Sequence, residues 1–90
     1  MTEKYSSEEI REFVMGTFEA QKQDSKAIVT LDSSITGDLG IDSLTIMEAV
    51  SDLEDKYELT FSDEDLPKVH TVGDVISIVE AELSKDGRLR

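Results

Sequence analysis

Three segments of this chain repeat apolar residues at the spacing of an amphipathic α-helix. The spacing predicts helices over 7–21, 43–57 and 72–84. Their apolar stripes are Ile10, Phe13, Val14, Thr17 and Phe18; Ile46, Val50, Leu53 and Tyr57; and Val72, Val75, Ile76, Val79 and Leu83. Because each helix must bury its stripe against another element, the three are expected to pack into a small bundle.

Polar residues mark the predicted helix starts. Ser6-x-x-Glu9 and Thr71-x-x-Asp74 have the spacing of capping boxes. Asp42 directly precedes the second helix, where its carboxylate can cap the helix and favour the positive end of the helix dipole. The three longer helices therefore have definite N-terminal signals.

The remaining segments are less regular. Ser62 and the acids after it have the pattern of a helix cap, and Pro67 allows only a short helix there, over 63–66. Residues 23–42 have no sustained period, but their scattered apolar residues predict a loop that is packed down. A strand over 27–30 is possible, although no second strand is available to pair with it. The expected fold is all-α: three longer helices, one short helix and a long loop between the first two helices.

The length of 90 residues predicts one domain, 1–90, with 1–6 and 85–90 frayed. No apolar run reaches about 18 residues, and the N-terminus has no apolar signal region. With no cysteine, the chain has neither disulfides nor a Cys-based zinc site. We expect a cytoplasmic monomer. Because the chain starts with its own Met and ends just past the last helix, we expect a discrete protein, although a domain cut from a multidomain synthase would look similar.

The net charge of −12 is the strongest compositional signal. Nucleic-acid binding needs clustered Lys and Arg, so it is excluded, and anionic membrane surfaces are disfavoured for the same reason. Nine acids and one lysine give residues 42–65 a local net charge of −8. Acids at i and i+4, such as Glu48 and Asp52, repel each other, which favours a basic partner surface. Solubility alone is the alternative explanation.

A glycine-punctuated stretch, Gly37-Asp38-Leu39-Gly40-Ile41-Asp42-Ser43-Leu44, leads into the second helix. The glycines allow tight turns, which leave the Ser43 hydroxyl exposed at a helix N-terminus. A phosphodiester formed there would be stabilised by backbone N–H groups and the helix dipole. The alternative is that Asp42 or Ser43 is an ordinary N-cap.

Residues 38–44 closely resemble the Asp-Leu-Gly-x-Asp-Ser-Leu signature of the acyl carrier protein family. The resemblance continues in order to about Leu83, through Glu48, Leu53-Glu54-Asp55-Lys56-Tyr57, Phe61-Ser62-Asp63-Glu64 and Val69-His70-Thr71-Val72-Gly73-Asp74-Val75. It implies that Ser43 carries 4'-phosphopantetheine, donated from coenzyme A by a separate phosphopantetheinyl transferase. The arm's thiol would then carry acyl groups as thioesters in fatty-acid or polyketide biosynthesis. Ser51 and Ser62 depart from the family pattern, which often has an apolar residue and Pro there.

The resemblance also implies which residues dock partner enzymes and which residues line a space for the acyl chain. The docking surface for basic patches on acyl-transfer, ketosynthase-type or ligase enzymes would be Asp42, Leu44, Met47, Glu48, Glu54 and Asp55. The residues lining a shelter for the acyl chain would be Val50, Leu53, Phe61, Val69 and Ile76. No residue is placed as a base beside Ser43, so no catalytic residue is expected, and the one histidine, His70, is interpreted as a loop or capping residue.

Other functions stay open at this point. An aminoacyl or peptidyl carrier would share the serine, and an acidic adaptor would use only the helix face. Residues 32–38 faintly resemble a calcium loop, but Ser43 stands where the loop needs its bidentate Glu, so no metal site is expected.

Overall fold

The computed structural model describes residues 4–23 and 25–89, and that part of the chain contains helices and no strand. The helices are α1 (Ser7–Gln21), α2 (Ser43–Tyr57), the short 3₁₀ helix η1 (Leu66–Lys68) and α3 (Val72–Lys85). The predicted all-α fold is confirmed. The bounds of α1 and α2 match the prediction, and α3 is one residue longer at its end.

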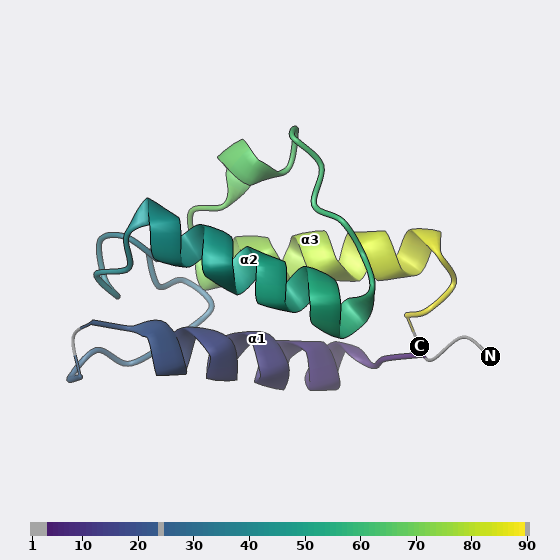
Figure 1. Cartoon of the computed structure of the whole chain (residues 1–90). Coiled ribbons are helices and arrows are strands. Elements are labelled where there is room, and N and C mark those ends of the chain that lie inside the picture. The colour runs from purple at the N-terminus through teal and green to yellow at the C-terminus, as the bar shows by residue number, and fades with distance from the viewer. Residues whose placement is uncertain (1–3, 24, 90) are drawn as a thin grey trace.

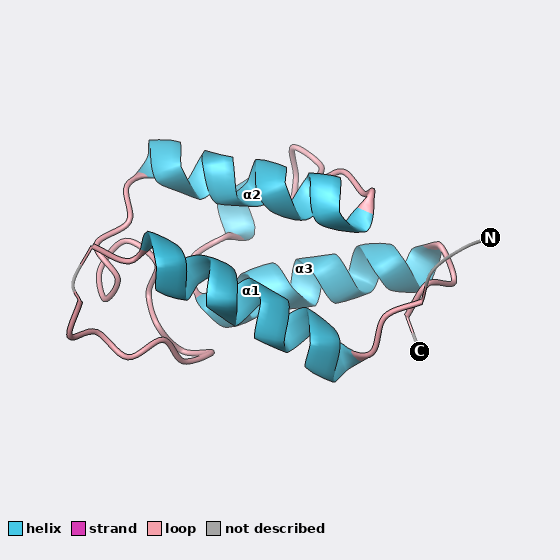
Figure 2. Cartoon of the chain, turned by 60° about the horizontal axis from the view of Figure 1, so that its bottom comes forward, coloured by secondary structure: helices cyan, strands magenta, loops and turns pink. Residues whose placement is uncertain are grey.

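The three α-helices lie side by side (Figures 1 and 2). The chain runs through α2 and α3 in the same direction and through α1 in the opposite direction (Figure 1). The segment after α2 passes over the bundle, forms η1 and returns to the start of α3 (Figure 1). The start of α2 therefore lies at one end of the bundle, and the start of α1 and the end of α3 lie at the other (Figure 1).

The predicted apolar stripes form most of the core. Its largest fully buried side chains come from all three helices and from the α1–α2 loop: Tyr57, Phe18, Ile10, Ile35, Leu39, Ile41, Leu53, Leu83, Val14, Val72, Val75 and Val79. Phe13 was predicted in the stripe of α1 but is 38% exposed. Its ring lies at the rim of the core, edge-on to Tyr57 and beneath the Lys56 ammonium, 5.2 Å from the ring centre.

The long loop between α1 and α2 is packed down, as predicted. Its N–H and C=O groups pair with the start of α3: Ile35 N–H donates to His70 O at 3.0 Å, and Gly73 N–H donates to Leu31 O at 2.8 Å. A Cβ on Gly73 would lie 3.0 Å from that Leu31 oxygen, so the loop would have to shift by a few tenths of an ångström to accept a larger residue. The possible strand over 27–30 does not form. The loop's only bridge in the described residues is isolated, between Ser34 and Thr71.

The short helix lies later than predicted. Residues 63–65 form a turn closed by Ser62 and Asp65, whose side chains each accept the other's backbone N–H. The helical turn η1 then includes Pro67 instead of ending before it. Proline is tolerated in a first helical turn because its missing N–H would have no partner there.

Residues 4–6 and 85–89 lie in the segments expected to be frayed, and several of them make contacts in the structure. Ser6 caps α1, and Tyr5 N–H donates to Arg88 O at 2.7 Å. Tyr5 and Arg88 are each only 8% exposed. No local pattern indicates this pairing, because it joins residues from opposite ends of the chain. Residues 1–3 and 90 lie outside the described residues.

Candidate functional site: an exposed serine at the head of α2

Asp42 and Ser43 form the start of α2. The Asp42 carboxylate accepts a hydrogen bond from Thr45 N–H at 2.8 Å, so the predicted cap is confirmed. This bond lowers the pKa of Asp42 below its ordinary value. Ser43 is the first residue of the helix and is exposed. The capping position is therefore taken by Asp42, which leaves the Ser43 hydroxyl available for chemistry.

The loop before Ser43 is anchored from inside. Leu39 and Ile41 are buried at 0% and 1% exposure, and Ile41 N–H donates to Ile35 O at 3.1 Å. Gly40 between them has φ +68°, a conformation that only glycine adopts readily. The two buried anchors and this turn hold the following Asp42 and Ser43 at the surface.

The segment considered as a calcium loop, residues 32–38, forms a local turn. The Asp38 carboxylate accepts Ser34 N–H at 2.8 Å, and the Ser34 hydroxyl accepts Gly37 N–H at 3.0 Å. Among the described residues, no group of three or more His, Cys, Asp or Glu side chains is arranged to hold a metal ion. Asp38 instead supports the loop that presents Ser43.

The six residues expected to dock partners all lie on or beside the outer side of α2. Leu44 and Met47 are 70% and 49% exposed and lie three residues apart on the same helix. Asp42, Glu48 and Asp55 are also exposed. Together with the two apolar side chains they form an acidic surface with an apolar centre.

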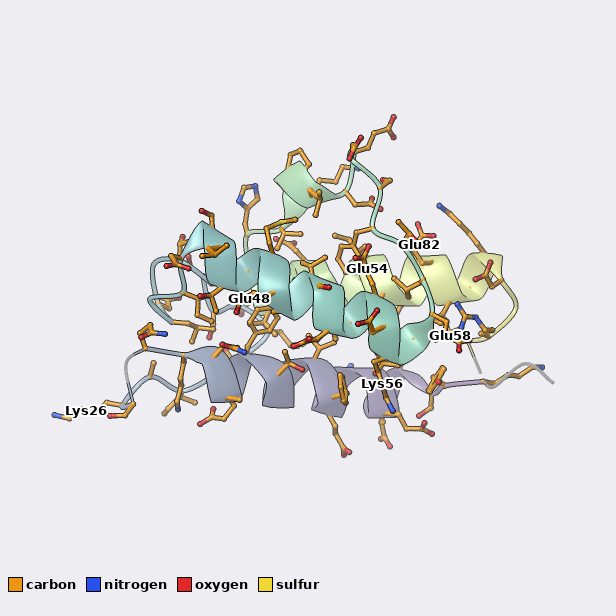
Figure 3. The ribbon with its side chains drawn as sticks, in the orientation of Figure 1. Lys26, Glu48, Glu54, Lys56, Glu58 and Glu82 are labelled. Atoms are coloured by element: carbon orange, nitrogen blue, oxygen red, sulfur yellow. The ribbon has the colours of Figure 1, made fainter. Side chains whose placement is uncertain are left out.

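Glu54 differs from the other five. It is half-buried, and its carboxylate accepts the backbone N–H of Phe61 at 2.8 Å. Figure 3 shows Glu54 beside the segment after α2. The sequence does not indicate this bond, because the bond joins residues seven apart through a turn whose shape no local pattern specifies.

The five residues expected to line an acyl shelter lie in or against the core. Val50, Leu53, Phe61 and Ile76 are between 0% and 6% exposed, and Val69 is half-buried against them. They come from α2, α3 and the segment between these helices. An open depression in the α1–α2 loop, lined by Ala27, Ile28, Thr30, Asp32, Ser33 and Asp38, includes none of them.

Comparisons with known proteins agree with this site. Residues 10–79 match the family described as phosphopantetheine attachment site. Over 55 residues the chain is 51% identical to the acyl carrier proteins of Exiguobacterium sibiricum and of a second Exiguobacterium species. Each match covers 61% of this chain and 70% of the relative.

A solved structure shows the same fold. It is of a protein from Mycobacterium tuberculosis assigned as an acyl carrier protein, with a TM-score of 0.71 at 28% identity. The likeness covers 80% of this chain and 96% of that protein. The chain therefore belongs to the family that carries a phosphopantetheine attachment site and, within it, to the acyl carrier proteins.

The cofactor of this family is covalently bound 4'-phosphopantetheine, and the start of α2 fits it. The first hydrogen bond within the helix is from Ile46 N–H to Asp42 O, so the N–H groups of Ser43 and Leu44 have no partner in the helix. A phosphodiester on Ser43 would meet these donors and the positive end of a 15-residue helix.

None of the helices in the described residues has the length and apolar character of a membrane span.

Proposed function

We propose that Ser43 is the residue to which 4'-phosphopantetheine is attached. The observation that carries this proposal is the exposed Ser43 as first residue of α2, directly after a cap already formed by Asp42. When attached, the group supplies a terminal thiol, which holds acyl groups as thioesters. The chain has no cysteine of its own that would compete for them.

The attachment reaction uses the Ser43 hydroxyl as nucleophile. Its oxygen forms a bond to the phosphorus that bears the pantetheine half of coenzyme A. The bond from that phosphorus to the adenosine half breaks, adenosine bisphosphate leaves, and the hydroxyl proton passes to a base on the transferase. This chain provides an exposed hydroxyl and N–H donors for the new phosphodiester, and we propose that it is a carrier and not itself a catalyst.

The acidic outer side of α2 is the proposed docking surface. Asp42, Glu48, Glu54 and Asp55 would meet basic patches, and Leu44 and Met47 would supply the apolar contact. Opposite charge speeds encounter and fixes orientation, which a carrier visiting several enzymes needs. The proposed partners are a phosphopantetheinyl transferase and acyl-transfer, ketosynthase-type or ligase enzymes. Because Ser43 begins the same helix, an enzyme docked on α2 would lie next to the phosphopantetheine group on Ser43.

The proposed shelter for a carried acyl chain is the space that Val50, Leu53, Phe61, Val69 and Ile76 surround. These side chains are apolar and belong to two helices and the segment joining them, so small shifts of that segment would admit an alkyl chain. Four further properties of this protein stay predictions: a role in fatty-acid or polyketide synthesis, a single domain, a monomeric state and a cytoplasmic location.

Intact-protein mass spectrometry tests the attachment site. The chain is incubated with coenzyme A, Mg²⁺ and a promiscuous phosphopantetheinyl transferase, beside Ser43→Ala and Ser51→Ala. Ser51 is an exposed serine on the same helix and serves as the matched control. We expect one added phosphopantetheine on the native chain and on Ser51→Ala, and none on Ser43→Ala. A folded native chain that gains no mass would refute the proposal and favour an unmodified acidic adaptor.

A further inference from the structure

The end of α2 is organised around Glu54. Its backbone carbonyl accepts the N–H groups of Glu58 and Leu59, which closes the helix. Its carboxylate accepts Phe61 N–H at 2.8 Å. Glu58 between them has φ 52° and ψ 51°, the left-handed conformation that reverses the chain at a helix end. One residue therefore fixes both where the helix ends and where the next segment begins.

That segment closes one side of the core. Phe61 is 5% exposed, and Leu59, Leu66 and Val69 pack against the core beside it. It connects the end of α2 to the start of α3 and passes over the bundle (Figure 1). Between Leu59 and the turn at Ser62, Phe61 N–H is held by a side chain of α2 and not by backbone. The Glu54 carboxylate is thus the hydrogen-bond acceptor that holds the Phe61 backbone, beside the packing of the Phe61 and Leu59 side chains.

Glu54 also borders the docking surface. Met47 precedes it by seven residues, about two helical turns, so the two side chains lie on the same side of α2. Asp55 is the next residue and is exposed. A basic group that approaches Met47 on this side of α2 therefore comes near the half-buried Glu54 carboxylate.

We propose that Glu54 is a positioning residue that couples partner docking to release of the segment carrying Phe61. An arginine of the partner pairs with a carboxylate through two parallel N–H···O bonds and so takes both oxygens. That geometry competes with Phe61 N–H for the Glu54 carboxylate. Docking would then loosen the segment over the proposed shelter at the moment when the carried group is needed outside.

This proposal rests on the proposed docking surface, and it specifies the partner chemistry as arginine. Lysine presents one ammonium group and can pair with one oxygen while the other keeps Phe61 N–H. Two basic peptides of equal charge therefore distinguish release of the segment from general attraction to an acidic surface.

Amide hydrogen exchange of Phe61, followed by NMR on the full-length chain, is the first test. We expect Glu54→Ala to speed Phe61 exchange by about tenfold or more, since the amide loses its acceptor. Glu54→Gln keeps a side-chain oxygen and should restore most of the protection. Asp52→Asn removes one charge from an exposed position of α2 outside the docking surface and should leave Phe61 exchange unchanged. Unaltered Phe61 exchange in a folded Glu54→Ala would overturn the proposal.

The second test adds a tetra-arginine or a tetralysine peptide to the wild type, Glu54→Ala and Asp52→Asn. The arginine peptide should speed Phe61 exchange in the wild type and in Asp52→Asn, and cause no further change in Glu54→Ala. The lysine peptide should bind, as shifts along α2 report, with little effect on Phe61. Equal acceleration by both peptides, or binding without acceleration, would contradict the coupling.

The same variants are assayed for loading at Ser43 by mass spectrometry. If Ser43 gains phosphopantetheine while the Phe61 exchange rate is the same with and without the Glu54 carboxylate, the coupling is refuted and the carrier function is supported. If Ser43 gains no phosphopantetheine while the Phe61 exchange rate changes as expected, the proposed attachment is refuted and the coupling is supported.

Discussion

At the scale of the residue, Asp74 shows how a capping carboxylate responds to pH. Its carboxylate accepts the N–H groups of Thr71 at 2.9 Å and of His70 at 3.2 Å, and the Thr71 hydroxyl accepts Asp74 N–H at 3.1 Å. The predicted capping box is therefore confirmed. The backbone hydrogen bond from Thr71 is the main cause of a lowered pKa for Asp74.

A lowered carboxyl pKa gives stability that is present at neutral pH and lost in acid. The unfolded chain binds the proton more readily, so the contribution of Asp74 is complete above its ordinary pKa of 3.8 and fades as the pH falls through the lower folded value. Asp74→Asn keeps the acceptor oxygen but loses the charge. We expect the wild type to exceed this variant in free energy of unfolding by about 0.5–1 kcal/mol at pH 6.

Urea unfolding of both proteins between pH 6 and pH 3 measures this difference. It should shrink below about pH 4 as the Asp74 carboxylate takes up its proton. Asp55→Asn, which removes an exposed carboxylate outside any cap, is the control. A gap between the wild type and Asp74→Asn that stays constant down to pH 3 would show that the charge of Asp74 is not what stabilises α3.

At the scale of the element, Arg88 joins the end of α2 to the segment after α3. The Arg88 guanidinium donates to the carbonyl oxygens of Tyr57 and Glu58 and to the Asp86 carboxylate. Helix ends leave carbonyls without partners, and a cation there also favours the negative end of the dipole. Because Arg88 is 8% exposed, water does not readily replace these bonds.

We predict that Arg88→Met lowers the free energy of unfolding by about 2–3 kcal/mol. Methionine keeps an apolar stem of similar length but leaves the carbonyls of Tyr57 and Glu58 without their donor. Lys85→Met is the matched control, since it removes one positive charge from an exposed pair with Glu82 and should cost less than about 0.5 kcal/mol. Chemical denaturation measures both. Similar small losses in the two variants would mean that the buried guanidinium contributes no more than a surface charge.

At the scale of the whole molecule, the net charge of −12 opposes the compact state. Acids crowd α2 and the segment after it, and Figure 3 shows Glu48, Glu54 and Glu58 along this part of the chain. Few cations offset them: Lys56 lies over the Phe13 ring, and Arg88 binds backbone carbonyls. The repulsion is therefore spread over the surface and is open to screening by salt.

We predict that the melting temperature at pH 7 rises by several degrees as salt increases from about 0.01 M to about 1 M. The screening length falls from about 30 Å to about 3 Å over this range, which removes most repulsion between exposed acids. A double variant of two exposed acids, Asp63→Asn with Glu64→Gln, should melt higher at low salt and respond less to added salt. Calorimetry in the same buffers checks both. A melting temperature that salt does not move would rule out surface repulsion as a main destabilising force.

Local signals in the sequence determined the three α-helices and the position of Ser43. The 3.6-residue apolar period, the caps at Ser6, Asp42 and Thr71, and the glycines before Asp42 act within a few residues, so they can be read along the chain. The exposure of Leu44 and Met47 fits the docking surface that the resemblance implies. The resemblance to acyl carrier proteins, carried by residues 38–83, was confirmed by the family match.

The contacts between distant parts of the chain became visible only in the folded structure. Tyr5 with Arg88, Arg88 with the end of α2, and Leu31 with Gly73 each pair segments that are far apart in sequence. The sequence places Glu54 only among the acids of the docking surface. In the structure, the turn after α2 brings Phe61 N–H to the Glu54 carboxylate. Such contacts depend on how helices pack and how loops return, and the hydrophobic period fixes which face of a helix is buried but not which distant group meets it.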